Sequence, residues 1–313
     1  MWSEKKRPWI ATVALGGFAL PNIWRRTLAV TAISVVITVA YMRIPALHVS
    51  ITTAPFVLIG LPLGIFLGFR NNTAYDRFWE GRKLWGALVN TSRSFTRQIL
   101  TLIEPQEGAE VTSPEALRQA EVRMVHHLIA YVNALRHLLR DADPHPSIAR
   151  ILRPEDAERL RDEENVPIAI LQRLAELLLE ARQARWIHPF HVPVLEQSLV
   201  VLTDIQGSCE RIKLTPIPYS YTVLIHRIVA GYCVLLPFGF AETIGWATPF
   251  VVLAVSYALF GLDSIGDEIE QPFGVDVNDL PLKAISRTIE RNLRRRLGEE
   301  LPPAVQPERG VLR

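Results

Sequence analysis

Uncharged apolar residues gather in four blocks near the two ends of the chain, arranged as two closely spaced pairs. The four blocks are residues 27–42, 44–69, 228–241 and 243–262. A helix needs about 20 residues to cross the hydrocarbon core of a bilayer. The second and fourth blocks reach that length, and the first and third reach it when extended through Trp24 and Trp246, which suit the interface. Core helices of a soluble protein are the alternative, but the paired arrangement favours four transmembrane helices.

The long charged region between the two pairs is helical by pattern. Ser113 followed by Pro114 predicts a helix start with an N-cap and proline in the first turn. Apolar residues then recur at spacings of three and four, which is typical of a helix. The stretches 166–186 and 192–214 show the same spacing and are predicted to be helices. No alternating strand pattern of useful length is present, so the sequence predicts an all-α fold. The apolar faces exceed what one thin bundle buries, which indicates packing against other subunits.

Lysine and arginine counts set the orientation of the spans. These residues flank the outer ends of both pairs, whereas the short link inside the first pair carries only Arg43 and the link inside the second carries none. Both termini and the middle region are therefore expected in the cytosol. The basic N-terminal run has no cleavage pattern of a signal peptide, and an interfacial segment anchored by Trp9 and Trp24 is expected instead.

These patterns divide the chain into six regions. They are an interfacial segment 1–23, transmembrane helices 1 and 2 in 24–70, a cytosolic helical region 71–226, transmembrane helices 3 and 4 in 227–262, a cytosolic helical region 263–297 and a disordered tail 298–313.

Composition narrows the functional classes. The mean hydropathy of +0.17 averages apolar blocks with a charged region, and 34 Lys+Arg against 32 Asp+Glu give a net charge of +2. That balance does not support a general nucleic-acid binder. Two cysteines, Cys209 and Cys233, without a CxxC motif exclude a disulfide-stapled secreted fold and a four-cysteine zinc site. No nucleotide-binding or nucleophile motif occurs, so we do not expect an enzyme.

The second block carries two stripes at helical spacing. Small residues recur at Gly60, Gly64 and Gly68. Large apolar residues recur beside them at Leu61, Ile65 and Phe69. The glycine spacing lets helix backbones approach closely in a bilayer. The large residues either face lipid or other helices of the same chain, or form rings around an axis that gate a pore by dewetting.

Long motifs next to these stripes resemble the bestrophin family in its bacterial branch. The motifs are FRNNTAYDRFWEGRKLWG at 69–86, DIQGSCERI at 204–212, TPIPY at 215–219 and EQPFGVDVNDLPL at 270–282. The resemblance extends over about residues 8–297. It implies a homopentamer around one axial pore, in the bacterial inner membrane, whose partners are further copies of the chain, membrane lipid and permeating monovalent ions, with no nucleic acid.

The same resemblance implies roles for particular residues. Leu61, Ile65 and Phe69 occupy the positions of the family's hydrophobic neck, and Val194, after Pro193, occupies the position of its narrow cytosolic aperture. The family assignment implies a chloride channel. A monovalent-cation (Na⁺/K⁺) channel of the same fold is the first alternative. A non-conducting membrane-anchored helical scaffold, or a membrane enzyme, is the alternative of another class.

No cofactor is expected. Animal bestrophins bind calcium with an acidic run after the Pro-Phe-Gly motif, but Val275, Val277 and Asn278 interrupt that run here. The remaining calcium candidates are Asp276, Asn278 and Asp279. The other carboxylates of this segment, including Asp263 and Asp267, are expected to cap helices and to pair with arginines of 287–296. No histidine pair has the spacing of a helical metal site, and His226 is expected only to anchor the third span.

Overall fold

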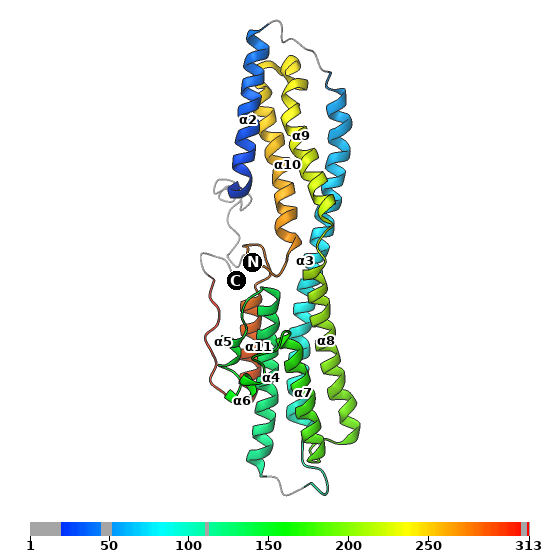
Figure 1. Cartoon of the computed structure of the whole chain (residues 1–313), viewed down its shortest axis with the longest axis vertical. Helices are drawn as coiled ribbons and strands as arrows, with labels where there is room; N and C mark the ends of the chain where they lie inside the picture. Colours follow the sequence, from blue (N-terminus) through cyan, green and yellow to red (C-terminus); the bar gives the residue numbers. More distant parts are fainter. Residues whose placement is uncertain (1–19, 45–51, 110–112, 308–311, 313) are drawn as a thin grey trace. The chain divides into compact units, whose positions relative to one another are not determined.

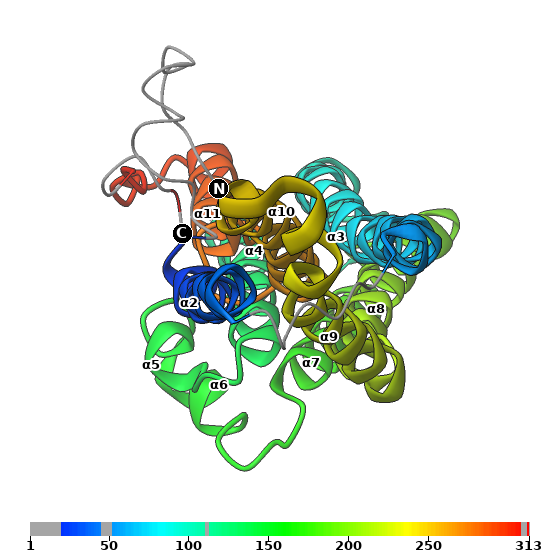
Figure 2. The same cartoon turned by 90° about the horizontal axis from the view of Figure 1, so that it is seen from above.

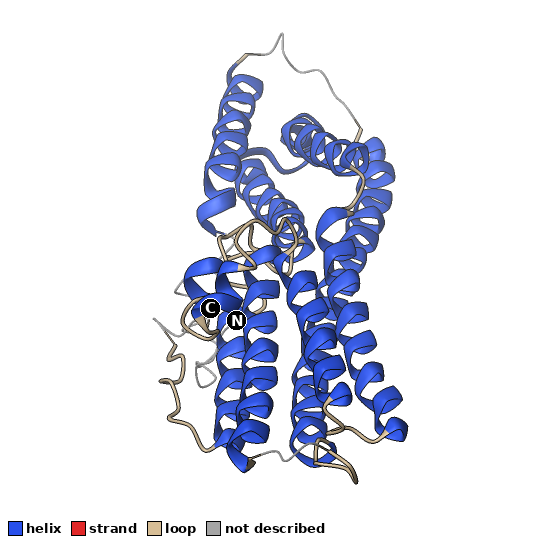
Figure 3. Cartoon of the chain, turned by 60° about the horizontal axis from the view of Figure 1, so that its bottom comes forward, coloured by secondary structure: helices blue, strands red, loops and turns tan. Residues whose placement is uncertain are grey.

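The structure, a computed structural model, describes residues 20–44, 52–109, 113–307 and 312. Within these residues it is helical and contains no strand; an isolated bridge between Ile103 and Ile187 is its only strand-like pairing (Figure 3). The chain divides into two compact units. We call them the apolar unit, which contains the residues described within 20–79 and 216–271, and the polar unit, which contains those described within 80–215 and 272–312.

Helices from both ends of the sequence build the apolar unit. They are α2 (Leu20–Arg43), the first half of α3 (Ala54–Leu102), α9 (Tyr219–Ile244) and α10 (Thr248–Glu270). Helices α2, α9 and α10 pack on one another, which Figure 2 shows end-on. Leu63 and Leu67 of α3 belong to the same buried cluster as Val229 and Cys233 of α9 and Val252 of α10.

A tight turn joins α9 to α10. Its residues form the 3-10 segment η3 (Gly245–Ala247), and Gly245 has a φ of 53°, a conformation that favours glycine. The Thr248 hydroxyl donates a 2.7 Å hydrogen bond to the Gly245 carbonyl oxygen, which closes the turn. Three helical stretches in the described residues are long and apolar enough to cross a membrane: Ile23–Arg43, Ala54–Leu102 and Tyr219–Glu270, the last of which contains α9, this turn and α10.

The apolar unit leaves much of its hydrophobic surface uncovered. Between 22% and 33% of the residues in the most apolar window of each stretch are buried. Val36, Leu58 and Phe250 have exposed fractions of 68%, 74% and 75%. Soluble monomers rarely expose contiguous apolar surface of this kind, so the outer faces of these helices fit contact with lipid or with other subunits.

Helix α3 is longer than the second apolar block. It continues without a break from Ala54 to Leu102, because the charged and aromatic residues that follow Arg70 are compatible with a helix. The predicted boundary between membrane and cytosol at residue 70 therefore falls inside a helix and stays a prediction. Pro62 lies inside α3 and does not mark its start.

The polar unit is a bundle built on α4 (Pro114–Leu139). Helices α5 (His145–Ile148), α7 (Val166–Gln183), α8 (Val192–Leu214) and α11 (Leu282–Leu297) contact it (Figure 1). The second half of α3 and the short helices α6 (Pro154–Glu158) and η2 (Pro189–His191) complete the unit. The predicted start of α4 is confirmed: the Ser113 hydroxyl accepts a 3.2 Å hydrogen bond from the Ala116 amide. The buried Tyr131 hydroxyl ties α4 to α8 through a 2.7 Å bond to the Leu202 carbonyl.

A buried ionic group joins α4 to α6. Arg123 forms two hydrogen bonds to the Asp156 carboxylate, at 2.9 and 2.5 Å, and the His127 ring lies 3.8 Å from the same carboxylate. Burial lowers the pKa of His127 below its ordinary value, because loss of water outweighs the hydrogen bond to the Arg123 carbonyl and the attraction of Asp156. His127 is therefore held neutral in the folded bundle near pH 7.

The first residues of the C-terminal tail are held against the polar unit. Gly298 ends α11 in the left-handed conformation, with a φ of 78°. The Glu299 carboxylate contacts His126 of α4 at 2.8 Å and Arg294 of α11 at 2.7 Å. Arg291 donates a hydrogen bond to the Pro302 carbonyl.

Candidate functional site

The predicted neck residues lie on the face of α3 that turns away from the core of the apolar unit. Leu61, Ile65 and Phe69 are 67%, 50% and 60% exposed, whereas Leu63 and Leu67 are 3% and 1% exposed. At about 100° per residue, Leu63 lies about 200° around the helix from Leu61. The large apolar stripe is therefore almost opposite to the residues that attach α3 to its own subunit.

The two flanks of α3 between these faces differ in size. The glycines lie on one flank, where a Cβ atom added at Gly64 or Gly68 meets nothing within 4 Å and one added at Gly60 meets the Tyr232 hydroxyl at 2.5 Å. The opposite flank carries Phe66, which is 53% exposed. Among the described residues, the glycine flank thus packs against another side chain only at Gly60. At Gly64 and Gly68 this flank is open, whereas the opposite flank carries the bulky side chain of Phe66.

The aperture candidate lies at the start of α8 in the polar unit. Val194 is 43% exposed, and with Pro193 and Gln197 it borders a cavity of about 540 Å³. The other wall of this cavity is the second half of α3, which contributes Asn90, Thr91, Ser94 and Gln98. The Ser198 hydroxyl donates a 2.7 Å hydrogen bond to the Gln98 side-chain oxygen, which fixes α8 against α3 next to Val194.

A second cavity of the polar unit, of about 750 Å³, is basic. It lies between α3 and α11, and its arginines are Arg93, Arg97, Arg295 and Arg296. No carboxylate lines it, and none of the four forms an ion pair among the described residues. The Thr96 hydroxyl and the Asn292 amide nitrogen, which also line it, are buried without a hydrogen-bond partner in the described structure. Unbalanced positive charge of this density attracts anions.

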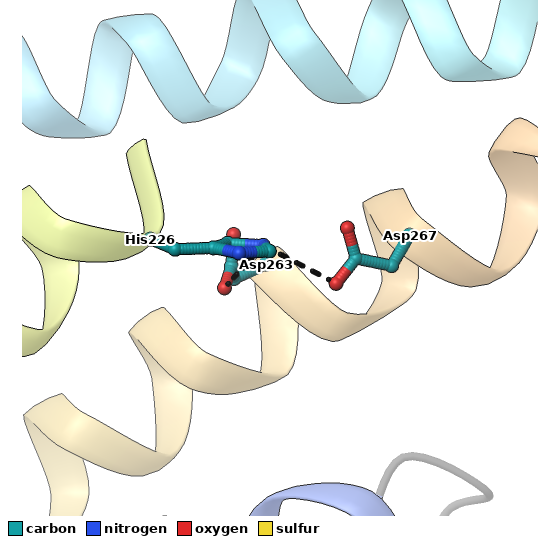
Figure 4. Close-up of side chains that lie close together, drawn as sticks. All are labelled: His226, Asp263 and Asp267. Atoms are coloured by element: carbon teal, nitrogen blue, oxygen red, sulfur yellow. Dashed lines mark ion pairs between the residues drawn. The ribbon is translucent and has the colours of Figure 1, made fainter. Parts of the chain in front are cut away.

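An ionic cluster occupies the polar end of the apolar unit. Arg70 of α3, which is 1% exposed, donates a 2.7 Å hydrogen bond from Nη1 to Asp263 Oδ1 and another hydrogen bond from Nη2 to Asp267 Oδ1. The other oxygen of each carboxylate faces α9: His226 Nε2 lies 3.3 Å from Asp263 Oδ2 and 3.3 Å from Asp267 Oδ2. Figure 4 shows the imidazole of α9 directed between the two carboxylates of α10.

This cluster corrects one expectation from the sequence. Asp263 and Asp267 were expected to pair with arginines of 287–296, but their partners are Arg70 and His226. Arg287 and Arg294 of α11 instead pair with Glu290 and Glu299. The expectation was wrong because it paired residues near in sequence, whereas α3 and α9 bring distant partners to the two carboxylates of α10.

The calcium candidates lie in the loop after α10, within the polar unit. Asp279 is 3% exposed, and its carboxylate accepts a 2.6 Å hydrogen bond from the Asp276 amide. Arg140 of α4 closes the same loop, with hydrogen bonds to the Phe273 and Leu280 carbonyls at 3.2 and 3.3 Å. Burial lowers the pKa of Arg140, and the nearby Asp279 opposes that shift. One candidate carboxylate is thus already engaged inside the loop, and the absence of calcium stays a prediction.

Comparisons with known proteins agree with the resemblance. The chain matches the family described as bacterial/fungal bestrophin protein over residues 1–295. A voltage-dependent anion channel-forming protein of Ralstonia nicotianae is 39% identical over 92% of this chain and 91% of that protein. A voltage-dependent anion channel-forming protein of Nostoc is 35% identical over 94% of this chain and 92% of that protein. The crystal structure of a bacterial bestrophin homologue from Klebsiella pneumoniae is similar with a TM-score of 0.82, at 33% identity, and covers 89% of this chain and 99% of that one.

Proposed function

The chain belongs to the bestrophin family, and from this premise we propose that it is the subunit of a homopentameric membrane channel that conducts monovalent anions passively. Leu61, Ile65 and Phe69 of each copy form the neck of the pore, and Val194 forms a narrower aperture in the cytosol. The apolar unit spans the bacterial inner membrane with four helices, and both termini and the polar unit lie in the cytosol.

One observation carries the proposal: the exposed apolar stripe faces away from its own subunit. Copies arranged in a ring, each with its core outward, turn this stripe toward a common axis. The rings of Leu61, Ile65 and Phe69 offer no polar ligand to an ion, so ions pass partly dehydrated and the neck gates by dewetting. In this arrangement, the open glycine flank of α3 in one copy contacts the Phe66 flank of α3 in the next copy. Such a head-to-tail contact, between two different surfaces of the chain, can repeat until the copies close a ring.

The sign of the permeant ion follows from electrostatics outside the neck. An apolar neck discriminates weakly among similar ions, so nearby fixed charges decide which ions enter it. The cavity with Arg93 and Arg97 lies along α3, the helix that also carries the neck residues, and no carboxylate is among the described residues of its lining. It favours anions, as do the names of the relatives from Ralstonia and Nostoc.

The neck assignment is tested with purified protein in liposomes. Ile65→Ala is expected to change chloride flux several-fold, because it widens one apolar ring. Ile59→Ala is the matched control: Ile59 and Ile65 are 49% and 50% exposed on the same helix, but lie about 120° apart around it. Equal effects of the two substitutions contradict the neck. Absence of flux in the unaltered protein supports the non-conducting scaffold.

The ion sign is tested by the reversal potential in a tenfold salt gradient. That gradient is worth about 1.4 kcal/mol, or about 59 mV for a channel perfectly selective for one monovalent ion. We expect the sign of an anion conductance, and a smaller magnitude in Arg97→Gln. Arg150→Gln, an exposed arginine outside the cavity lining, is the control. The opposite sign establishes the monovalent-cation alternative.

A further inference from the structure

The cluster at the polar end of the apolar unit has the composition of a metal site. We propose that His226, Asp263 and Asp267 bind one divalent cation of the zinc class, with an imidazole nitrogen and two carboxylate oxygens as ligands. The ligand atoms all lie within 4.8 Å of one another and come from two neighbouring helices (Figure 4). This site goes beyond ion conduction and depends on no feature of the pore.

The distances fit a tetrahedral ion better than they fit hydrogen bonds. Zinc binds nitrogen and oxygen ligands at about 2.0–2.2 Å, which separates two ligands of a tetrahedron by about 3.4 Å. The Nε2 atom of His226 lies 3.3 Å from each facing oxygen. Among the described residues this atom is buried and has no hydrogen-bond partner. A charge-assisted hydrogen bond between these groups prefers about 2.7–2.9 Å.

Arg70 prepares the two carboxylates for this role. It holds Oδ1 of Asp263 and Oδ1 of Asp267, and thereby leaves both Oδ2 atoms directed at the imidazole. Hydrogen bonds to the outer oxygen of a ligating carboxylate orient it, and such outer-shell partners contribute strongly to metal affinity. The positive charge of Arg70 is balanced by one of the two carboxylates, so it does not prevent binding of a cation to the pair.

The ligand set distinguishes between classes of cation. Calcium takes six to eight oxygen ligands, whereas this site offers two carboxylates and a nitrogen. An imidazole with carboxylates suits zinc, and three protein ligands leave the fourth position open. His226 and Asp267 have side-chain exposures of 35% and 42%, which gives an ion a path from solvent. Bound there, it joins α9 to α10 at the end of their hairpin.

The site is tested on the full chain, solubilised in detergent and stripped with chelator. After incubation with zinc and desalting, we expect one zinc per chain by elemental analysis. His226→Ala and Asp267→Asn are expected to weaken binding by at least about tenfold, since even loss of an outer-shell partner costs that much. His145→Ala and Asp143→Asn are matched controls, because this exposed pair offers one imidazole and one carboxylate at 2.6 Å.

Cobalt substitution makes the test independent of the variants. Co²⁺ in a tetrahedral site with nitrogen and oxygen ligands gives strong visible absorption, whereas octahedral Co²⁺ absorbs weakly. We expect the tetrahedral spectrum in the unaltered protein and its displacement by zinc. Failure to retain zinc, an octahedral cobalt spectrum, or equal zinc retention in His226→Ala, Asp267→Asn and the unaltered protein overturns the proposal.

Discussion

The ion pair between Arg70 of α3 and Asp263 of α10 lies buried in the apolar unit. Both side chains are almost fully buried, with exposures of 0% and 3%. Arg70→Met keeps a long apolar side chain on α3 but leaves the Asp263 carboxylate without its guanidinium. Because a buried unpaired charge is far less stable than a buried pair, the substitution is expected to destabilise the protein strongly.

The magnitude follows from burial. Removing one partner of a buried ion pair costs about 3–5 kcal/mol. The contact of Arg70 with Asp267 adds little, because that carboxylate is 42% exposed and is screened by water. For a large domain, 1 kcal/mol moves the unfolding midpoint by about 2–4 °C. Arg70→Met is therefore expected to lower the midpoint by on the order of 10 °C.

The assay is thermal unfolding of the detergent-solubilised, chelator-treated protein, with all variants measured in the same buffer at one pH. Arg211→Met is the control, since Arg211 and its partner Glu80 are 65% and 41% exposed and such a pair is worth less than about 1 kcal/mol. The double variant Arg70→Met, Asp263→Asn is expected to recover part of the loss, because no unpaired charge is left. If Arg70→Met loses no more than Arg211→Met, burial of this pair does not govern its energetics.

Two further predictions concern acid stability and assembly. Burial lowers the pKa of His127 in the folded protein below the ordinary 6.5, so the contribution of neutral His127 to stability is complete above that pH and is lost as the pH falls. Between about pH 7.5 and 5.5, the unfolding midpoint of His127→Gln is therefore expected to fall less than that of the unaltered protein. His145→Gln is not expected to reduce that loss, because a hydrogen bond to Asp143 raises the pKa of His145. Cysteines introduced together at Gly64 and Phe66 are expected to form disulfides between copies under mild oxidation, visible as ladders on a denaturing gel. Neither cysteine alone is expected to give a ladder, and a double variant that stays monomeric contradicts the head-to-tail contact.

Local signals in the sequence were sufficient for much of the fold. The start of α4 was predicted correctly because a cap and a proline are read within a few residues of the helix they begin. The end of the second apolar block did not indicate where α3 ends, because a fall in hydropathy marks where apolar side chains stop and not where a helix stops. Charged residues with good helix propensity continue α3 through Leu102.

The ionic cluster of Arg70, His226, Asp263 and Asp267 was missed because its members come from three helices. A search for histidine ligands one helical turn apart has no access to ligands on a neighbouring helix. A signal was nevertheless present in the hairpin: His226 lies 19 residues before Gly245, and Asp267 lies 19 residues after Thr248. At 1.5 Å per residue both are about 28 Å from the turn. Equal depth in an antiparallel hairpin places these two residues at the same level, and Asp263 precedes Asp267 by about one helical turn.

The neck residues illustrate the opposite case, in which one chain alone does not decide a role. An exposed leucine or phenylalanine on a membrane helix is equally stable against lipid and against an apolar pore ring, so the exposure of Leu61 and Phe69 fits both. The two flanks of α3 favour the pore ring over contact with lipid alone. A helix that faces only lipid gains nothing from residues without side chains, whereas Gly64 and Gly68 reduce contact with lipid and admit a neighbouring backbone. In the proposed ring, with the core on one face and a neighbour on each flank, the remaining face of α3 is directed toward the axis that the copies share.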